Sequence, residues 1–166
     1  MSIISEKNGV IMEIIGLKEK TGISDNVNLN NLYQQFQELL NELRKRELPD
    51  NIVELINRDI EELNSSASTG KELRKLFKKK QNIIVQLLEK ELKIVPKNYY
   101  QNLWLAIGMS VFGLPIGIVF GMLVLDNMAF FAIGIPIGMV IGMSVGSGMD
   151  KKAQQEGRQL DVVLKY

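Results

Sequence analysis

A ten-residue pattern occurs twice near the carboxyl end of this chain, and both copies lie in long stretches without an ionisable side chain. The copies begin at Gly113 and Gly134, and each has the form Gly-x-Pro-x-Gly-x-x-x-Gly-Met. The two uncharged stretches, 101–125 and 127–149, are separated by Asp126 alone. Because roughly 20 apolar residues cross a ~30 Å hydrocarbon core as a helix, the pattern predicts two membrane-spanning helices joined by a very tight turn.

The charges that flank these stretches predict their orientation. The turn carries Asp126 but no Lys or Arg, and cations at the ends of spans mark the cytoplasmic face. We therefore expect a multi-pass protein of the inner (cytoplasmic) membrane with both termini in the cytoplasm. Tyr99, Tyr100 and Trp104 suit the headgroup level and place the boundary near residue 100. The flanking cations are Lys90, Lys93 and Lys97 before the first span, and Lys151, Lys152 and Arg158 after the second.

The glycines of each stretch recur every four residues, so they predict a ridge of small residues on one side of each helix. Such ridges allow helices in lipid to approach closely, so we expect an antiparallel pair and self-association of copies. A proline in each copy removes a helical hydrogen bond, which predicts helices that kink or loosen and can gate. The alternative is that the glycines only pack the hairpin. The expected packing or gating residues are Gly113, Pro115, Gly117, Gly121, Gly134, Pro136, Gly138, Gly142 and Gly146.

Composition argues against catalysis. The chain has 166 residues and contains neither His nor Cys, so the commonest general base and every thiolate site are absent. About a hundred residues remain outside the apolar stretches, which is below the usual size of an enzyme with its own substrate pocket. We expect no enzyme, no cofactor and no metal site. The amino-terminal residues also lack the long apolar run of a cleavable signal peptide.

The remaining sequence predicts a mainly α-helical cytosolic domain at 1–97, ahead of the transmembrane hairpin at 101–149 and a cytosolic tail at 150–166. Short strands are expected at both termini: Asn8-Gly9 favours a hairpin, and the tail alternates from Leu160 onward, so it could pair with the amino-terminal segment. Apolar residues at three- and four-residue steps predict three helices in between. These helices run from about Asn30 to Glu47, from an Asp50 cap to about Leu63, and from a cap at Ser68 or Thr69 toward Ile94.

Cations at three- and four-residue steps predict a basic face on the third of these helices. In a symmetric oligomer such a face would repeat around an axis and attract a nucleotide or a short nucleic acid. The competing interpretation is a solvated face or a contact with lipid headgroups. No glycine-rich phosphate loop accompanies the face. Its residues are Lys71, Arg74, Lys75, Lys78 and Lys79, followed by Lys80.

The segment from Phe112 to Lys152 resembles the bacterial glycine-zipper proteins with two transmembrane spans. The chain as a whole, with a helical module joined to a membrane hairpin, looks like the membrane effectors of nucleotide-signalled antiphage defence, such as the Hailong type. That resemblance implies a homo-oligomeric channel controlled by an oligonucleotide. It would assign ligand binding to the basic face and gating to the glycines.

Two functions are therefore expected to compete. The first is a homo-oligomeric ion channel or pore whose cytosolic helices sense an anionic ligand. Because the spans carry no charge, such a pore would be narrow, mostly apolar and gated by dewetting. The second is a membrane anchor that recruits a cytosolic partner and never conducts.

Overall fold

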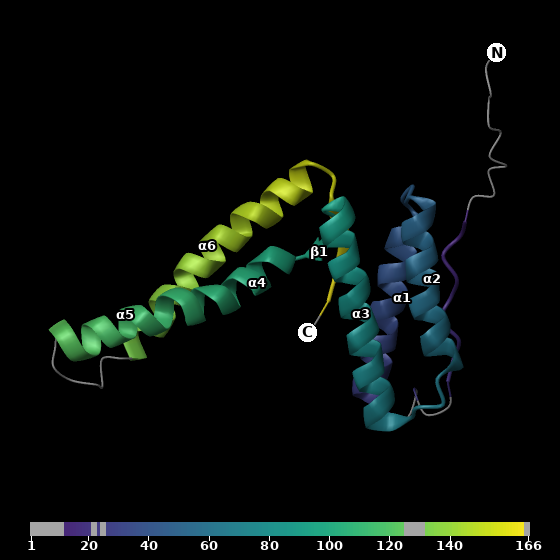
Figure 1. Ribbon diagram of the computed structural model, residues 1–166, viewed down its shortest axis with the longest axis horizontal. Coiled ribbons are helices and arrows are strands. Elements are labelled where there is room, and N and C mark those ends of the chain that lie inside the picture. Colours follow the sequence, from purple (N-terminus) through teal and green to yellow (C-terminus); the bar gives the residue numbers. More distant parts are fainter. Residues whose placement is uncertain (1–11, 21–22, 24–25, 125–131, 165–166) are drawn as a thin grey trace, which may run out of the picture. The chain divides into compact units, whose positions relative to one another are not determined.

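The computed structural model of the chain describes residues 12–20, 23, 26–124 and 132–164. Within them the protein is mainly helical with two short strands, so the predicted fold class is confirmed at this level (Figure 1). The predicted hairpin at Asn8-Gly9 lies outside the described residues. Contacts divide the chain into two compact units between Leu88 and Glu89. We call these units the helical unit and the hairpin unit.

The helical unit consists of three helices whose apolar faces make one core. The rings of Tyr33 and Phe36 in the first helix both meet Phe77 of the third edge to face, with centroids 6.0 Å and 5.9 Å apart. Ile56 and Ile60 of the second helix are fully buried. The apolar stripes read from the sequence therefore face inward, as amphipathic spacing requires. The helices are α1 (Val27–Arg44), α2 (Asp50–Ser65) and α3 (Gly70–Leu92), of which the last turn, from Glu89, belongs to the hairpin unit.

Helix ends differ from the sequence prediction by a few residues. The α1 helix begins at Val27 because the side chain of Asn26 caps it, accepting hydrogen bonds from the backbone N–H groups of Asn28 (3.1 Å) and Leu29 (3.2 Å). The sequence predicts Asp50 as the cap of the second helix, but Pro49 occupies the cap position and Asp50 is the first helical residue. Its carboxylate still lies in the first turn, where the helix dipole favours an anion.

The hairpin unit pairs two long helical arms (Figure 1). The first arm is continuous, and its part from Tyr99 to Met122 is long and apolar enough to cross a membrane. Within the described residues no second helix reaches that standard, because α6 is described only from Gly134 and meets Asp150 before twenty apolar residues have passed. The elements are β1 (Val95–Lys97), α4 (Tyr99–Ile107), π-helical η1 (Gly108–Gly113), α5 (Leu114–Ile118), π-helical η2 (Val119–Val124), α6 (Gly134–Gln155) and β2 (Gln159–Val163).

The carboxyl-terminal tail forms the predicted strand, but with a different partner. β2 pairs in parallel with β1, where Val95 lies opposite Gln159 and Pro96 opposite Leu160. The predicted partner is the amino-terminal segment, of which residues 1–11 lie outside the described residues and residues 12–20 contain no strand. Alternation correctly indicated which side chains are buried, because Leu160 and Val162 face inward. It could not indicate the partner, because pairing is a long-range property.

Candidate functional site

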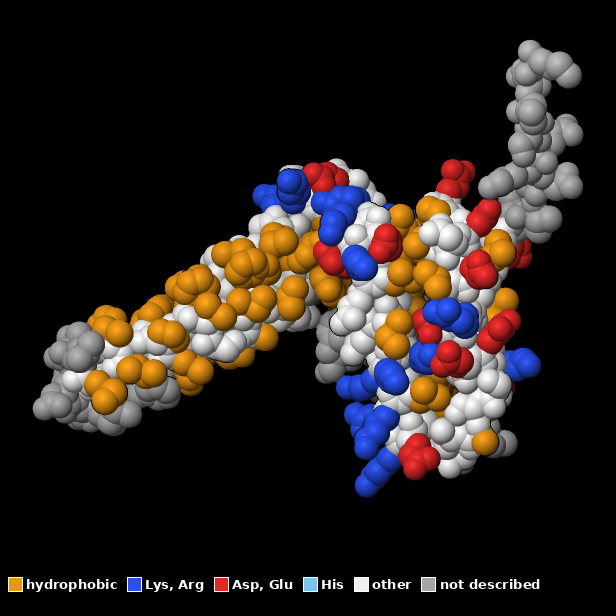
Figure 2. Space-filling model, viewed as in Figure 1, with side chains coloured by type: hydrophobic (Ala, Val, Ile, Leu, Met, Phe, Trp, Pro, Cys, Tyr) orange, Lys and Arg blue, Asp and Glu red, His pale blue; other side chains and the backbone are white. Residues whose placement is uncertain are grey.

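The predicted basic face lies on α3, on the side away from the core. The buried residues Leu73 and Phe77 occupy the opposite side of the helix. Figure 2 shows Lys and Arg side chains gathered along this helix. Within the described ranges none of the five predicted residues makes an ion pair, although the charge of Lys79 contributes to lowering the pKa of Glu62 on α2. Lys71, Arg74, Lys75 and Lys79 are exposed, and Lys78 is half-buried.

Lys80, which ends the basic run in the sequence, points into the bundle instead. Its ammonium group donates hydrogen bonds to Asp59 (2.7 Å) and Glu62 of α2. Burial works to lower the pKa of Lys80, but the hydrogen bonds to Asp59 and Glu62 prevail and raise it. The hydrogen bond from Lys80 also lowers the pKa of Glu62. Lys80 therefore ties α2 to α3 and does not belong to the basic face.

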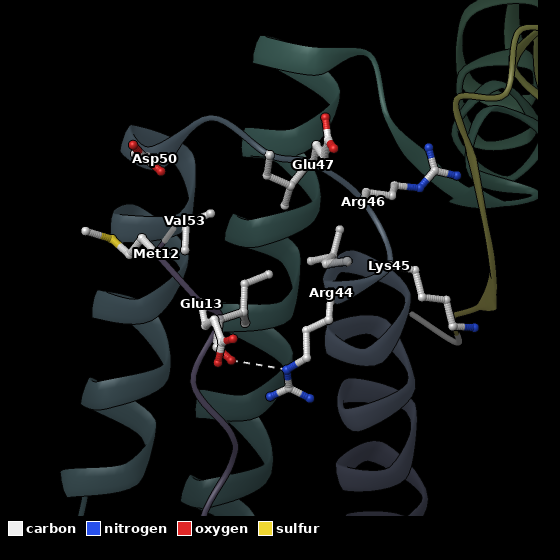
Figure 3. A pocket seen from close by; sticks show the side chains of 11 residues that line it. Met12, Glu13, Arg44, Lys45, Arg46, Glu47, Asp50 and Val53 are labelled. Carbon is white, nitrogen blue, oxygen red and sulfur yellow. Dashed lines mark hydrogen bonds between the residues drawn. The ribbon is translucent and has the colours of Figure 1, made fainter. Parts of the chain in front are cut away.

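The basic face is an open surface and not a cavity. Two hollows in the helical unit, of about 630 Å³ and 580 Å³, contain none of its residues. Figure 3 shows the larger one, where the Nε of Arg44 donates to the carbonyl oxygen of Ile14 at 3.1 Å (the dashed line). Cations and acids are mixed around it, so neither sign of ligand charge is favoured. Its charged lining residues are Glu13, Arg44, Lys45, Arg46, Glu47 and Asp50.

The two glycine ridges face each other inside one chain. A Cβ added to Gly138 would lie 2.6 Å from the backbone nitrogen of Gly113, and one added to Gly146 would lie 2.5 Å from the Cα of Gln101. Real Cβ atoms essentially never come that close, so only glycine fits at these positions. We call this contact the glycine seam. It packs Gly134 on Gly117 and Gly142 on Trp104, and Gly121 is buried as well.

The seam gives the predicted antiparallel pair but uses the glycines within a single chain. Contacts run in opposite directions along the two arms, from Gly117 with Gly134 to Gln101 with Gly146. The sequence also predicts that the ridges join copies of the chain. Because the seam brings main chain against main chain, that part of the ridge is already occupied by the chain's own second arm. Association of copies of the chain through the ridges stays a prediction.

Gly108 joins the seam because the first arm is π-helical there. The four-residue spacing does not include Gly108 in the ridge, since it precedes Gly113 by five residues instead of four. In an α-helix of 3.6 residues per turn, such residues face different sides. The η1 segment bonds residues five apart, as the N–H of Leu114 does with the carbonyl of Met109. Both glycines are thereby buried against α6.

The matched prolines have different roles. Pro115 is the second residue of α5, just after η1, and an α-helix would bring its ring against the carbonyl of the fourth preceding residue. The wider π-helical turn before it is one of the ways in which a helix absorbs such a defect. Pro136 lies in the first turn of α6, where the missing N–H would have no partner in any case. Within the described residues, the loosened helix predicted for both arms is therefore seen only next to Pro115.

An acidic residue that the sequence analysis missed closes the base of the hairpin. Asp150 of α6 is buried, and its carboxylate accepts hydrogen bonds from the N–H groups of Tyr100 (3.1 Å) and Gln101 (2.9 Å). These donors belong to the first turn of α4, where a carboxylate also interacts well with the helix dipole. Asn98, at the cap position, makes no such bond. The sequence feature that could have identified it is that Asp150 is the first charged residue after the second apolar stretch.

The outer surface of both arms is apolar and uncovered. Only 17% of the apolar window in Tyr99–Met122 is buried, although this arm packs along the whole seam. Figure 2 shows hydrophobic side chains over the length of the two arms. The largest exposures belong to residues that point away from the seam. These include Val111, Met122 and Val140, which are 57%, 57% and 60% exposed.

Most cations that flank the arms are paired with acids. Lys93 lies 3.5 Å from Glu89 and Lys90 lies 3.6 Å from Glu91. The predicted orientation depends on the positions of Lys and Arg and not on net charge, so this pairing does not alter it. The remaining pairs are Lys97 with Asp161, Lys152 with Glu156, and Arg158 with Glu156.

Two further findings concern metal ligands and similarity to known proteins. Among the described residues no group of three or more His, Cys, Asp or Glu side chains is placed to hold a metal ion. Comparison with protein-family models, curated proteins and solved structures finds no match to this chain.

Proposed function

We propose that this protein is a homo-oligomeric membrane effector. In this proposal the hairpin unit inserts into the inner membrane with both termini in the cytoplasm. The basic face of α3 then binds an anionic ligand, such as a nucleotide or oligonucleotide, that sets the state of a pore. The resemblance to glycine-zipper proteins and to Hailong-type effectors is part of this proposal.

The apolar exterior of the hairpin unit is the observation that supports it best. A helix pair in water buries its large apolar side chains in the contact, whereas here the contact is made by glycines and the large side chains point outward. Small residues inside and apolar residues outside are the arrangement by which helices associate in lipid. The first arm also has a mean hydropathy of 2.1 over its apolar window, which suits the bilayer core.

The basic face supports the sensing part. Its cations make no ion pair within the described residues and form an open strip, which suits an extended polyanion better than an enclosed small molecule. No aromatic side chain besides Phe77 lies within the run, and Phe77 is buried, so binding would depend on phosphates more than on base stacking.

The glycine seam favours a second candidate, the non-conducting anchor. It joins the arms through their backbones, and the polar side chains Ser110 and Ser144 donate their hydroxyl protons to carbonyls of their own helices. These hydroxyls therefore provide little lining for ions in this packing. In the anchor reading the hairpin holds the protein on the membrane and the helical unit binds the partner.

Two double variants, measured in two assays, separate the channel from the anchor. Arg74→Gln with Lys75→Gln removes two cations from the basic face, and Lys18→Gln with Lys90→Gln removes the same charge elsewhere. We expect only the first pair to weaken oligonucleotide binding to the detergent-purified protein. The slope of affinity against log salt should fall by about one for each phosphate that the protein no longer neutralises.

Membrane depolarisation of expressing cells is measured in parallel. The channel requires that the first double variant also changes depolarisation, whereas the anchor requires no depolarisation in any variant. Equal binding by both pairs would show that the basic face is a solvated surface, which would remove the sensor from the proposal.

A further inference from the structure

The first arm carries one residue more than α6 along the same stretch of the glycine seam. On the first arm Gly117 and Gly113 are four residues apart, but the next glycine in contact with α6 is Gly108, five residues before Gly113. The η1 segment lies between these two glycines, so its π-helical turn takes up the extra residue. The seam glycines of α6 are all four residues apart, and they are Gly134, Gly138, Gly142 and Gly146.

A regular α-helix would bring a different residue into the seam. Residues four apart lie on the same side of an α-helix, so Met109 and not Gly108 would share the side of Gly113. A Cβ added to Gly108 would already lie 2.3 Å from the carbonyl oxygen of Gly138 and 2.8 Å from the Cα of Gly142. The much larger side chain of Met109 cannot occupy that place while the arms are in contact. A closed seam therefore excludes the α-helical register here.

Opposing effects act on η1. Pro115 favours the π-helical form, because in an α-helix its ring would clash with a carbonyl, and the close contact of the glycines favours it as well. Intrinsic preference favours the α-helix, since π-helices are rare and occur mostly as single-turn bulges. The two forms differ by one residue of register, which is a rotation of about 100° within the first arm. The element thus has two discrete packings.

The hydroxyl of Ser110 suits both forms. It donates to the carbonyl oxygens of Ala106 (2.6 Å) and Ile107 (3.4 Å). A change between π-helix and α-helix moves the backbone N–H groups of a segment from one carbonyl to the next, and in lipid a carbonyl without a donor is costly. Because the Ser110 hydroxyl reaches two consecutive carbonyls, it can stay bonded while the backbone partners change.

We propose that η1 is the gating element of the hairpin. In the π-helical form Gly108 lies in the seam and the arms are closed. In the α-helical form Met109 replaces Gly108, and its side chain holds the arms apart beside Gly138 and Gly142. The inference rests on the proposed function for what this opening controls. The change of register itself is measurable even in a hairpin that does not conduct.

Two variants that differ by a single residue test the switch. Pro115→Ala removes the clash, so a second, α-helical population with parted arms is expected. Deletion of Val111 from that variant places Gly108 four residues before Gly113, so an α-helix then keeps the seam closed. Val111 is 57% exposed, so its side chain is not needed for the packing. The matched control is Pro136→Ala, because Pro136 lies in the first turn of α6.

Spin labels on the two arms report their separation. The chain has no natural cysteine, and Leu103→Cys with Val145→Cys places one label on an exposed site of each arm. The full-length protein is reconstituted in vesicles of phosphatidylethanolamine and phosphatidylglycerol, and pulsed electron paramagnetic resonance gives the distance distribution. We expect a single distance in the unchanged protein and in Pro136→Ala. An additional distance is expected in Pro115→Ala, and it should disappear when Val111 is also deleted.

A distribution in Pro115→Ala identical to that of the unchanged protein would overturn the switch. An additional distance that persists after deletion of Val111 would overturn it as well. If Pro115→Ala alone does not insert into membranes, deletion of Val111 should restore insertion, and a failure to restore it would contradict the proposal.

Depolarisation of expressing cells tests the proposed function separately. We expect Pro115→Ala to increase depolarisation several-fold and the added deletion of Val111 to return it to the level of the unchanged protein. An additional distance in Pro115→Ala without any depolarisation would support the switch and contradict the channel. Failure of the switch and failure of the channel are therefore distinguishable.

Discussion

The two units of this protein have opposite interiors. The helical unit buries large side chains such as Phe36, Phe77 and Leu39 and exposes charges. The hairpin unit buries glycines and exposes Val111, Val140 and other large apolar side chains. Both units consist of packed helices, but large apolar side chains form the helix contacts of the helical unit, whereas glycines form those of the hairpin unit.

This difference indicates the solvent for which each unit is suited. In water, helices associate because apolar side chains leave the solvent, so the contact must contain them. In lipid that driving force is absent, and close backbone approach through small residues takes its place. The following predictions challenge or sharpen this comparison, beginning with the largest expected effect.

Truncation of the aromatic core should affect the helical unit alone. Phe77 is fully buried and contacts both Tyr33 and Phe36, so Phe77→Ala should reduce the stability of the helical unit by about 4 kcal/mol. Denaturation followed by circular dichroism measures this loss. The single Trp of the chain, Trp104, lies in the hairpin unit, and its fluorescence should not change. A parallel change at Trp104 would show that the units do not fold separately.

A charge on the exterior of the hairpin should cost more than the same charge on the helical unit. Val140→Lys places an ammonium on the outside of α6 and should disfavour membrane insertion by about 3 kcal/mol if it lies near the bilayer centre. The matched change is Val27→Lys, since Val27 is 72% exposed on α1 and should tolerate the charge. Carbonate extraction of membranes reports the inserted fraction. Equal extraction of both variants would place the hairpin exterior in water.

A single methyl group in the seam should matter more than one beside it. Gly146→Ala would bring its Cβ within 2.5 Å of main-chain atoms of the first arm, whereas a Cβ on Gly148 would meet nothing within 4 Å. We expect Gly146→Ala to destabilise the hairpin by about 2 kcal/mol through overpacking. Gly148→Ala should be neutral or slightly stabilising, because alanine favours the helix. Thermal unfolding in detergent, followed through Trp104, compares the two.

Acid should weaken the helical unit slightly through Glu62. Its pKa in the folded protein is lowered by the hydrogen bond with Lys80, so its contribution is present above the ordinary value of 4.5 and is lost as pH falls through the folded value. The pKa of Lys80 is raised, so its contribution persists at neutral pH and is lost only at strongly alkaline pH. Glu62→Gln should flatten the acid side of the stability profile relative to the unchanged protein. Identical profiles for Glu62→Gln and the unchanged protein would show that Glu62 does not contribute to the pH dependence of stability.

Local sequence patterns predicted the helices well and their ends less well. Apolar spacing located all three helices of the helical unit, because it depends only on residues a few positions apart. The start of α1 was misplaced because the capping role of Asn26 was not recognised. The basic face was predicted from the same periodicity. Lys80 shows the limit of that approach, since only the position of α2 explains why its side chain is buried.

By itself, the sequence determined the two apolar stretches, the four-residue glycine spacing, the amphipathic helices and the alternating tail, because each is a periodic property of neighbouring residues. The tertiary structure decided which partner each element meets. It placed β2 beside β1, brought Gly108 into the seam through a π-helical turn, and set Asp150 on the first turn of α4. These outcomes depend on contacts between residues far apart in the chain, and no local period encodes them.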